Sequence, residues 1–314
     1  MEKIVILDGY VANSGDLSWD ALNAVGELTV YDRTAPADVV SRAKGATCVF
    51  TNKVLITDEV MASLPELKFI GVLATGYNNV DIEAARRRGI TVCNVPAYST
   101  DSVAQLVFAH LLNIVNTIGD YADSVNGGEW GGNRDFSYRL RPFDELAGMT
   151  MGIIGMGNIG RRVAAIARAF GMTVVTNSER ELPDGVTRTD LETLFKVSDV
   201  VSLNSALTAK TKGIVNRSTL ALMKPTAILI NTSRGPLVDE EALAEALNSS
   251  RLAAAGIDVL CEEPPRKGSP LIGCKNCFVT PHIAWQSSQA RQRLIDISVA
   301  NLKAYVAGSP QNVV

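Results

Sequence analysis

A repeated alternation of short apolar segments with stretches of helical periodicity most constrains how this chain can fold. Apolar strands separated by helices predict a parallel sheet covered on both faces. The pattern occurs twice, and at roughly 100–200 residues per domain a chain of 314 residues favours two domains. We therefore predict an α/β protein with two doubly wound parallel-sheet domains. The predicted strands are Lys3–Leu7, Leu28–Tyr31, Thr47–Thr51, Lys68–Leu73, Thr91–Asn94, Thr150–Ile154, Thr173–Thr176, Val200–Leu203, Ala227–Ile230, Ala254–Asp258 and Phe278–Thr280.

The predicted helices indicate where the domains meet. A helix over Asn79–Arg88 ends before a glycine, as helices commonly do. A long helix over Ser99–Thr117 has apolar residues at helical spacing, and we expect it to link the domains. The following segment, Gly127–Arg141, is rich in glycine, arginine and aromatic residues, and its length favours an arm or a subunit contact. The last helix, Ser288–Val306, precedes no further strand, so we expect it to return to the first domain.

Composition and charge exclude several classes of function. A net charge of −3 argues against a nucleic-acid footprint, and no apolar run approaches the ~18 residues of a membrane helix. The first apolar run, Ile4–Leu7, is closed by Asp8, so we expect no signal peptide. Five scattered cysteines favour reduced thiols and a cytoplasmic location. Cys274 and Cys277 form a C-x-x-C, but no second pair or histidine cluster completes a metal site.

The stretch GMGNIG, Gly155 to Gly160, fits the G-x-G-x-x-G pattern of a dinucleotide-binding turn. A strand precedes it, and a helix and a second strand follow, which is the context the pattern needs. The first glycine permits the tight turn, the second lets the backbone approach a pyrophosphate, and the third lets helix and strand pack closely. The helix N-terminus stabilises the anion. The predicted dinucleotide contacts are Gly155, Gly157, Asn158, Ile159 and Gly160.

The end of the strand after the turn bears on the choice between NAD(H) and NADP(H). An acidic residue there would bind the ribose 2′-hydroxyl of NAD. Ser178 stands where that acid is expected, and Glu179 comes one residue late. Arg180 offers a positive charge to a 2′-phosphate. The sequence leaves both cofactors open with a slight preference for NADP(H), and these residues can equally be an ordinary surface loop.

Three side chains with catalytic chemistry follow strands of the second domain. Ligands of open α/β sheets bind outside the carboxyl ends of the strands, and Arg234, Glu263 and His282 each come after such an end. An arginine can bind a substrate carboxylate and polarise its carbonyl, a histidine can give a proton to the new alkoxide, and a carboxylate favours the imidazolium. The trio suits hydride transfer to a 2-oxo acid. Alternatively, Arg234 and Glu263 form a structural ion pair. The other histidine, His110, lies on the apolar face of a helix and is predicted to be a satisfied core or interface residue.

Four motifs occur together in this chain: the glycine turn, NTSRGPLVDEEAL (Asn231–Leu243), GIDVLCEEPP (Gly256–Pro265) and TPHIAW (Thr280–Trp285). On this combination the chain resembles the D-isomer-specific 2-hydroxyacid dehydrogenases along essentially its whole length. Three further stretches indicate the branch of the family. They are most similar to the glycerate dehydrogenase or hydroxypyruvate reductase branch, and they are FTNKV (Phe50–Val54), GVLATGYNNVD (Gly71–Asp81) and NVPAYSTDSVAQ (Asn94–Gln105).

The resemblance implies a domain organisation and an assembly. A discontinuous, flavodoxin-like substrate domain would comprise residues 1–100 and 286–314, and an inserted Rossmann NAD(P)-binding domain residues 101–285, with a cleft between them. The family also implies a homodimer held through the cofactor domain and the arm near Trp130.

The resemblance also assigns roles to individual positions. Arg234 would bind the substrate carboxylate and carbonyl, His282 would be the acid/base, and Glu263 would pair with His282, since the family's glutamate directly precedes the proline. Asp258 matches the position that holds the nicotinamide carboxamide. The backbone amides of one loop would bind the substrate carboxylate, and two further positions would line the cofactor. These are Ala74, Thr75 and Gly76 for the loop, and Ser205 and Thr232 for the cofactor.

Two departures from the family pattern bear on the site. Many members have an aspartate at the position of Ser178, and many have a histidine at that of Asn204. The predicted reaction is the interconversion of a small D-2-hydroxy acid and its 2-oxo acid, D-glycerate and hydroxypyruvate first and glyoxylate second. One alternative is the same chemistry on a phosphate- or phosphonate-bearing 2-oxo acid, which Lys53 could serve. Another is a dinucleotide-sensing corepressor, which would need partner-binding tails that we do not expect here.

Overall fold

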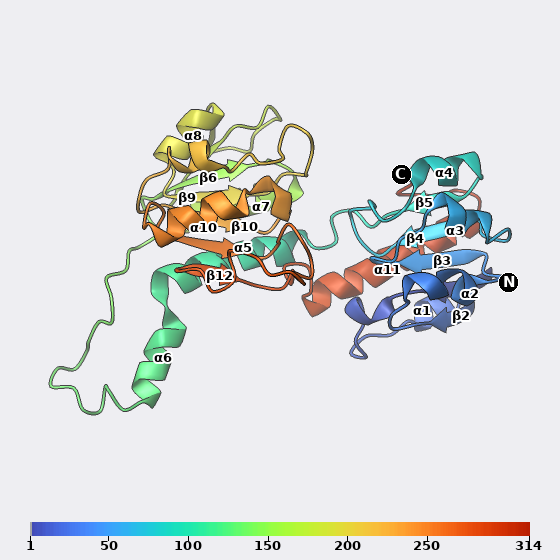
Figure 1. Ribbon diagram of the computed structural model, residues 1–314, viewed down its shortest axis with the longest axis horizontal. Coiled ribbons are helices and arrows are strands. Elements are labelled where there is room, and N and C mark those ends of the chain that lie inside the picture. Colours follow the sequence, from blue (N-terminus) through green and yellow to red (C-terminus); the bar gives the residue numbers. More distant parts are fainter. Residues whose placement is uncertain (1) are drawn as a thin grey trace. The chain divides into compact units, whose positions relative to one another are not determined.

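The computed structural model describes residues 2–314. They form two compact units, the first of residues 2–99 with 285–314 and the second of residues 100–284. Each unit is built on one β-sheet whose neighbouring strands are all parallel (Figure 1). The predicted α/β class with two doubly wound parallel sheets is confirmed.

The sheet of the first unit has the strand order β2-β1-β3-β4-β5. This is the flavodoxin-like order, and its direction of growth reverses between β1 and β3. Successive residues of β1 point to opposite faces, so Val5 packs with one set of helices and Ile4 with another. The strands are β1 (Glu2–Ile6), β2 (Gly26–Val30), β3 (Cys48–Thr51), β4 (Phe69–Val72) and β5 (Thr91–Cys93).

Helices cover both faces of this sheet. On one face, buried residues of α2, α3 and α4 pack against Val5, Val49 and Ile70. On the other, buried residues of α1 and α11 pack against Ile4 and Phe69, and α11 runs beside β4 (Figure 1). The helices are α1 (Asp20–Asn23), α2 (Val39–Ala43), α3 (Asp58–Ala62), α4 (Ile82–Arg87) and α11 (Ser288–Val306), with short 3-10 turns η1 (Gly9–Val11) and η2 (Pro36–Asp38).

The sheet of the second unit has the order β12-β11-β10-β9-β6-β7-β8. Counted from β6, this is the order 3-2-1-4-5-6 of a Rossmann fold with one more strand at its end. The order reverses between β6 and β9, which marks the expected nucleotide site. The strands are β6 (Thr150–Ile154), β7 (Thr173–Thr176), β8 (Val186–Arg188), β9 (Val200–Leu203), β10 (Ile228–Asn231), β11 (Ala254–Ile257) and β12 (Cys277–Val279).

Two hydrophobic clusters cover the faces of the second sheet. One joins α5 and α7 to the sheet through residues such as Val107 and Val163. The other joins α8, α9 and α10 to the opposite face through residues such as Phe195 and Leu243. The helices are α5 (Thr100–Asn116), α6 (Ile118–Asn126), α7 (Asn158–Ala169), α8 (Leu191–Val197), α9 (Arg217–Leu220) and α10 (Glu240–Asn248), with the 3-10 turn η3 (Gly235–Leu237).

The structure differs from the sequence predictions at three elements. The helix predicted to start at Asn79 starts at Ile82, because Asp81 caps it by accepting a hydrogen bond from the N–H of Ala84 at 2.9 Å. Strand β8 was not predicted, since its three residues are half-buried or exposed and lack an apolar pattern. Helix α6 was not predicted either, because none of its residues is buried. The predicted strands otherwise agree with the structure to within two residues at each end.

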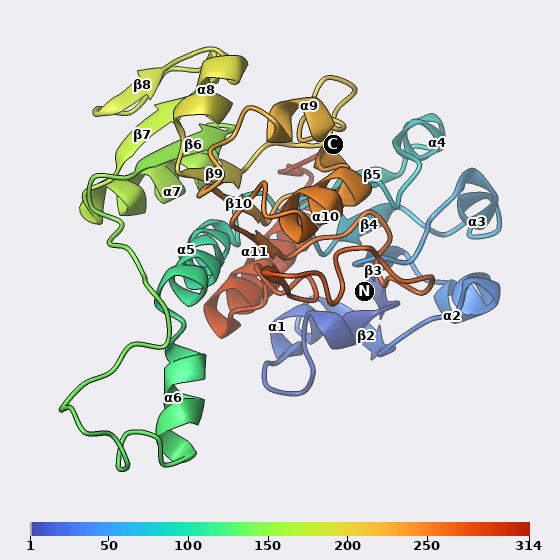
Figure 2. The ribbon, with the colours of Figure 1, turned by 60° about the vertical axis from the view of Figure 1, so that its left-hand side comes forward.

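Beyond α6 the second unit extends an irregular arm away from its sheet (Figure 2). Thr117, at a left-handed φ of 47°, separates α5 from α6 and lies where the chain bends by 52°. Within residues 2–314, no single helix is long and apolar enough to cross a membrane, although α5 and α6 pass that test together. The sheet-facing side of α5 is buried in its own unit.

Candidate active site

The glycine turn has the geometry that each of its glycines was predicted to provide. Gly155 has a φ of +98°, and a Cβ there would lie 2.6 Å from the carbonyl oxygen of Asn204, so only glycine fits. A Cβ at Gly160 would lie 2.0 Å from the carbonyl oxygen of Gly155, which explains the close packing of α7 on the turn. At Gly157, the residue before α7, the nearest atom to such a Cβ is an Arg180 nitrogen at 4.0 Å. The backbone there is open to an approaching phosphate group.

Buried polar atoms beside the turn indicate that a ligand belongs there. Oδ1 of Asn204, Oγ of Ser205 and Oγ1 of Thr232 are buried without a hydrogen-bond partner among residues 2–314. Asn204 and Ser205 follow β9, which pairs with β6, and Thr232 follows β10, the strand on the other side of β9. Buried polar groups are nearly always paired in native proteins. Ser205 and Thr232 therefore fit the cofactor-lining role predicted for them, and Asn204 adds a third oxygen at the departure noted in the sequence.

The loop after β7 is organised by an arginine that the sequence did not single out. Arg188, in the unpredicted β8, donates hydrogen bonds to the carbonyl oxygens of Ser178 at 2.9 Å and Arg180 at 2.8 Å. The N–H of Arg180 donates to Oγ of Ser178 at 3.2 Å. Glu179 and Arg180 are exposed, and Ser178 is half-buried. The loop thus places the exposed guanidinium of Arg180 close to the glycine turn.

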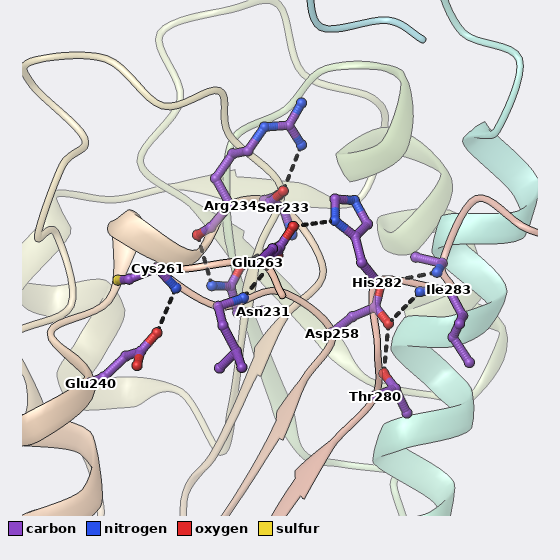
Figure 3. Close-up of polar contacts among 12 residues, drawn as sticks. Asn231, Ser233, Arg234, Glu240, Asp258, Cys261, Glu263, Thr280, His282 and Ile283 are labelled. Atoms are coloured by element: carbon purple, nitrogen blue, oxygen red, sulfur yellow. Dashed lines mark hydrogen bonds and ion pairs between the residues drawn. The ribbon is translucent and has the colours of Figure 1, made fainter. Parts of the chain in front are cut away.

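His282 and Glu263 form a close pair after β12 and β11 (Figure 3). Nδ1 of His282 lies 2.7 Å from Oε2 of Glu263, and their side chains are 28 % and 34 % exposed. Oε1 of Glu263 also accepts a hydrogen bond from the N–H of Leu260 at 2.9 Å, which fixes the carboxylate. Because Nδ1 faces the carboxylate, Nε2 is the ring nitrogen left to exchange a proton with a substrate.

Arg234 follows β10 and is exposed. Its Nη1 donates to the carbonyl oxygen of Ser233 at 2.7 Å, and its own carbonyl accepts a hydrogen bond from Asn231 at 2.9 Å (Figure 3). The next residue, Gly235, packs so closely on the β11 loop that a Cβ would lie 2.0 Å from the carbonyl carbon of Leu260. This contact joins the loop that carries Arg234 to the loop that carries Glu263.

Asp258, predicted to hold the nicotinamide carboxamide, is 1 % exposed and forms hydrogen bonds within its own unit. Its carboxylate accepts hydrogen bonds from the hydroxyl of Thr280 at 2.6 Å and from the N–H groups of Ile283 and Ala284 at 2.9 Å each. Its backbone carbonyl accepts the N–H of His282 at 2.9 Å. Whatever else it binds, Asp258 anchors the loop that carries His282 (Figure 3).

The predicted substrate loop belongs to the first unit and follows β4. The carbonyl of Ala74 accepts the N–H of Val95 at 3.0 Å, and the hydroxyl of Thr75 donates to the carbonyl of Val95 at 2.8 Å. In residues 2–314, the N–H groups of Ala74, Thr75 and Gly76 have no hydrogen-bond partner. Three free backbone donors in a fixed loop suit the binding of a carboxylate.

The fold and these residues define a dinucleotide-dependent oxidoreductase. A family model described as "D-isomer specific 2-hydroxyacid dehydrogenase, NAD binding domain" matches residues 108–284. The chain belongs to the D-isomer specific 2-hydroxyacid dehydrogenases.

Relatives of known name cover nearly the whole chain. It is 46 % identical to a hydroxypyruvate reductase of Blautia hydrogenotrophica, over 99 % of both chains. It is 41 % identical to a glycerate dehydrogenase of Methylorubrum extorquens, over 100 % of this chain and 99 % of that one. The solved structure of an acyclic imino acid reductase, Bsp5, in complex with NADPH and D-Arg is similar with a TM-score of 0.87 and 32 % identity, over 99 % of both chains.

Proposed function

We propose that this protein interconverts a small D-2-hydroxy acid and its 2-oxo acid, with D-glycerate and hydroxypyruvate as the main pair and glyoxylate as a second substrate. The observation that carries the proposal is the 2.7 Å pair of His282 and Glu263, in the same unit as the glycine turn. A histidine held by a carboxylate is the acid that reduction of a carbonyl needs. The names of the two close relatives support this substrate pair.

In the proposed reaction each residue has a separate task. A bound nicotinamide supplies the hydride that reduces C2 of the 2-oxo acid. The guanidinium of Arg234 binds the substrate carboxylate and polarises the carbonyl oxygen. Nε2 of His282 gives that oxygen its proton, and Glu263 stabilises the positive charge that His282 carries before the transfer. The free N–H groups of Ala74, Thr75 and Gly76 bind the substrate carboxylate. In the oxidative direction His282 takes the proton back.

Turnover of hydroxypyruvate tests the proposal directly. The purified protein is mixed with hydroxypyruvate and either NADH or NADPH, and loss of reduced-nicotinamide absorbance is followed. We expect turnover, with a slight preference for NADPH because Ser178 and the exposed Arg180 offer a 2′-phosphate a hydroxyl and a positive charge. Dinucleotide binding without turnover of hydroxypyruvate, glyoxylate or a phosphate-bearing 2-oxo acid would contradict the proposal and favour the sensor alternative.

Replacing Glu263 with glutamine should lower kcat for 2-oxo acid reduction. The carboxylate lies 2.7 Å from Nδ1 of His282 and stabilises the ring from which the substrate takes its proton, and a neutral amide does so far less. The measurement is kcat at saturating dinucleotide and 2-oxo acid. Glu262→Gln, at the exposed neighbouring acid, is the matched control. A kcat lowered equally in both variants, or in neither, would leave Glu263 a structural role only.

We also propose that the protein is a homodimer that uses the arm of the second unit. The arm exposes large apolar side chains, with Phe136 92 % and Trp130 52 % exposed, and such patches mark contact surfaces. Light scattering should give a molar mass of twice 33.5 kDa. Phe136→Asp should shift the population toward the monomer, whereas Ile272→Asp, at an exposed apolar residue of another loop, should not. A monomeric native protein would refute this assembly.

The cytoplasmic location stays a prediction, and all five cysteines are free thiols.

A further inference from the structure

His110 lies in the interior of the second unit, outside the residues that the proposed reaction uses. It is 5 % exposed and comes from the sheet-facing side of α5. Its imidazole rests on Gly256 of β11, where a Cβ would lie 2.7 Å from Cβ and 3.0 Å from Nδ1 of the histidine. The glycine therefore makes room for this ring. Nε2 of His110 is 3.1 Å from Oγ1 of Thr280, so the ring reaches the loop that carries His282. His110 was predicted to be a satisfied core or interface residue, and the structure places it in the core with a hydrogen-bond partner.

The direction of these hydrogen bonds follows from the number of available protons. The hydroxyl of Thr280 has one hydrogen, which it donates to Oδ1 of Asp258 at 2.6 Å. Its oxygen can then only accept from His110, so Nε2 of His110 carries a proton. Burial lowers the pKa of His110, against the opposing charge of Asp258, so the ring is neutral and its Nδ1 is unprotonated. The polar chain thus runs from His110 through Thr280 to Asp258.

Asp258 in turn forms hydrogen bonds with the backbone at His282 and at the two residues that follow it. Its backbone carbonyl holds the N–H of His282, and its carboxylate holds the N–H groups of Ile283 and Ala284. The backbone at His282 has a φ of 54°, in the left-handed region that costs a non-glycine residue free energy and persists only where its surroundings enforce it. The three hydrogen bonds to Asp258 supply that enforcement.

We infer that His110 and Thr280 are positioning residues, which fix Asp258 through a buried hydrogen-bond chain and thereby hold His282 in its proton-transfer geometry. This inference rests on the proposed function, in which His282 is the acid. Neither His110 nor Thr280 touches the reacting atoms in it. A purely structural role would change stability alone, whereas a positioning role changes kcat in a folded protein that still binds its dinucleotide.

Paired substitutions at Thr280 separate the two roles. Thr280→Val keeps the shape and removes the hydroxyl, and Thr280→Ser keeps the hydroxyl. We expect Thr280→Val to lower kcat for hydroxypyruvate about 10- to 100-fold at saturating dinucleotide, because a misplacement of about 1 Å can cost on the order of 10²-fold. Thr280→Ser should restore most of that loss. Ser198→Ala, which removes a buried hydroxyl elsewhere in the same unit, should leave kcat unchanged.

A double substitution tests whether the two residues act through one chain. His110→Phe removes the Nε2 donor and retains a ring, and we expect a loss of kcat smaller than that of Thr280→Val. If both act through Asp258, His110→Phe combined with Thr280→Val should be no slower than Thr280→Val alone. Losses that multiply, or a Thr280→Val protein with near-normal kcat, would overturn the inference. So would a Thr280→Ser protein as slow as Thr280→Val.

The chain has only two histidines, so NMR of histidine labelled with ¹⁵N gives a test that needs no turnover. At neutral pH His110 should show the neutral ring protonated at Nε2, with assignments from the single-histidine variants His110→Phe and His282→Asn. Thr280→Val should shift the ring signals of His282, and Thr280→Ser should not. A His110 protonated at Nδ1 or at both nitrogens, or His282 signals unmoved in Thr280→Val, would overturn the inference. If the native protein reduces no 2-oxo acid, the proposed function fails, while these spectra still decide whether the chain orders His282.

Discussion

Replacing His282 with asparagine should lower kcat for hydroxypyruvate reduction by about 10²–10⁴-fold, the usual contribution of general acid catalysis. His282 is the group that Glu263 holds at 2.7 Å, and asparagine has no proton to give at neutral pH. Asparagine is also the substitution that the backbone accepts best, because it tolerates the left-handed φ of 54° more readily than most residues. The loss of rate is then a loss of chemistry rather than of loop geometry.

Two further measurements on His282→Asn make the result specific. The half-exposed pair with Glu263 contributes little to folding, so the thermal midpoint should stay close to that of the native protein. The affinity for the reduced dinucleotide, followed by nicotinamide fluorescence, should change less than about two-fold, since a proton donor to substrate adds nothing to cofactor binding in the free enzyme. A variant that keeps kcat within ten-fold of the native value would exclude His282 as the acid.

The residues of this site could be predicted because their positions depend on the sheet. In parallel α/β folds the strand ends fix which loops meet, so the loops of Glu263 and His282 could be placed at one sheet edge from the order of elements. The pairing of these two side chains was implied by the family resemblance. The sequence could not show that the carboxylate of Asp258 accepts hydrogen bonds from the backbone after His282, because these bonds depend on how the loop after β12 folds back on β11. Nor could it show that Oδ1 of Asn204 is buried without a partner, because the position of this atom depends on the register of β9 against β6.

The elements that sequence reasoning missed are those without an apolar signature. Strand β8 has one half-buried residue at its start and two exposed ones, and it is stabilised by parallel pairing with β7. Its Arg188 then holds the loop after β7 by a hydrogen bond to the carbonyl of Ser178, so missing a three-residue strand also hid the residue that organises this loop. Helix α6 has no buried residue, and a pattern defined by burial cannot find such a helix. Both belong to parts of the chain where tertiary context decides the local structure.

Replacing Gly155 with alanine should abolish tight dinucleotide binding and lower the free energy of unfolding by about 3 kcal/mol. The backbone there has a φ of +98°, which costs an L-residue roughly 1–2 kcal/mol. The new Cβ would also lie 2.6 Å from the carbonyl oxygen of Asn204, and such overpacking adds about 1–3 kcal/mol. Relieving the clash must move β6's turn away from β9, at the point where the strand order reverses and the pyrophosphate is expected.

Gly268→Ala separates the two causes, because Gly268 has a similar φ of +84° but no heavy atom within 4 Å of its Cβ position. We expect that control to lose about 1 kcal/mol and to bind dinucleotide normally. By calorimetry the thermal unfolding midpoint of Gly268→Ala should fall by roughly 2–4 °C, and the midpoint of Gly155→Ala should fall about three times as far. Binding titrations with NADH and NADPH should show the affinity lost in Gly155→Ala alone. Equal affinities in both variants would mean that the turn tolerates a methyl group, and that the close approach of Gly155 to Asn204 does not shape the nucleotide site.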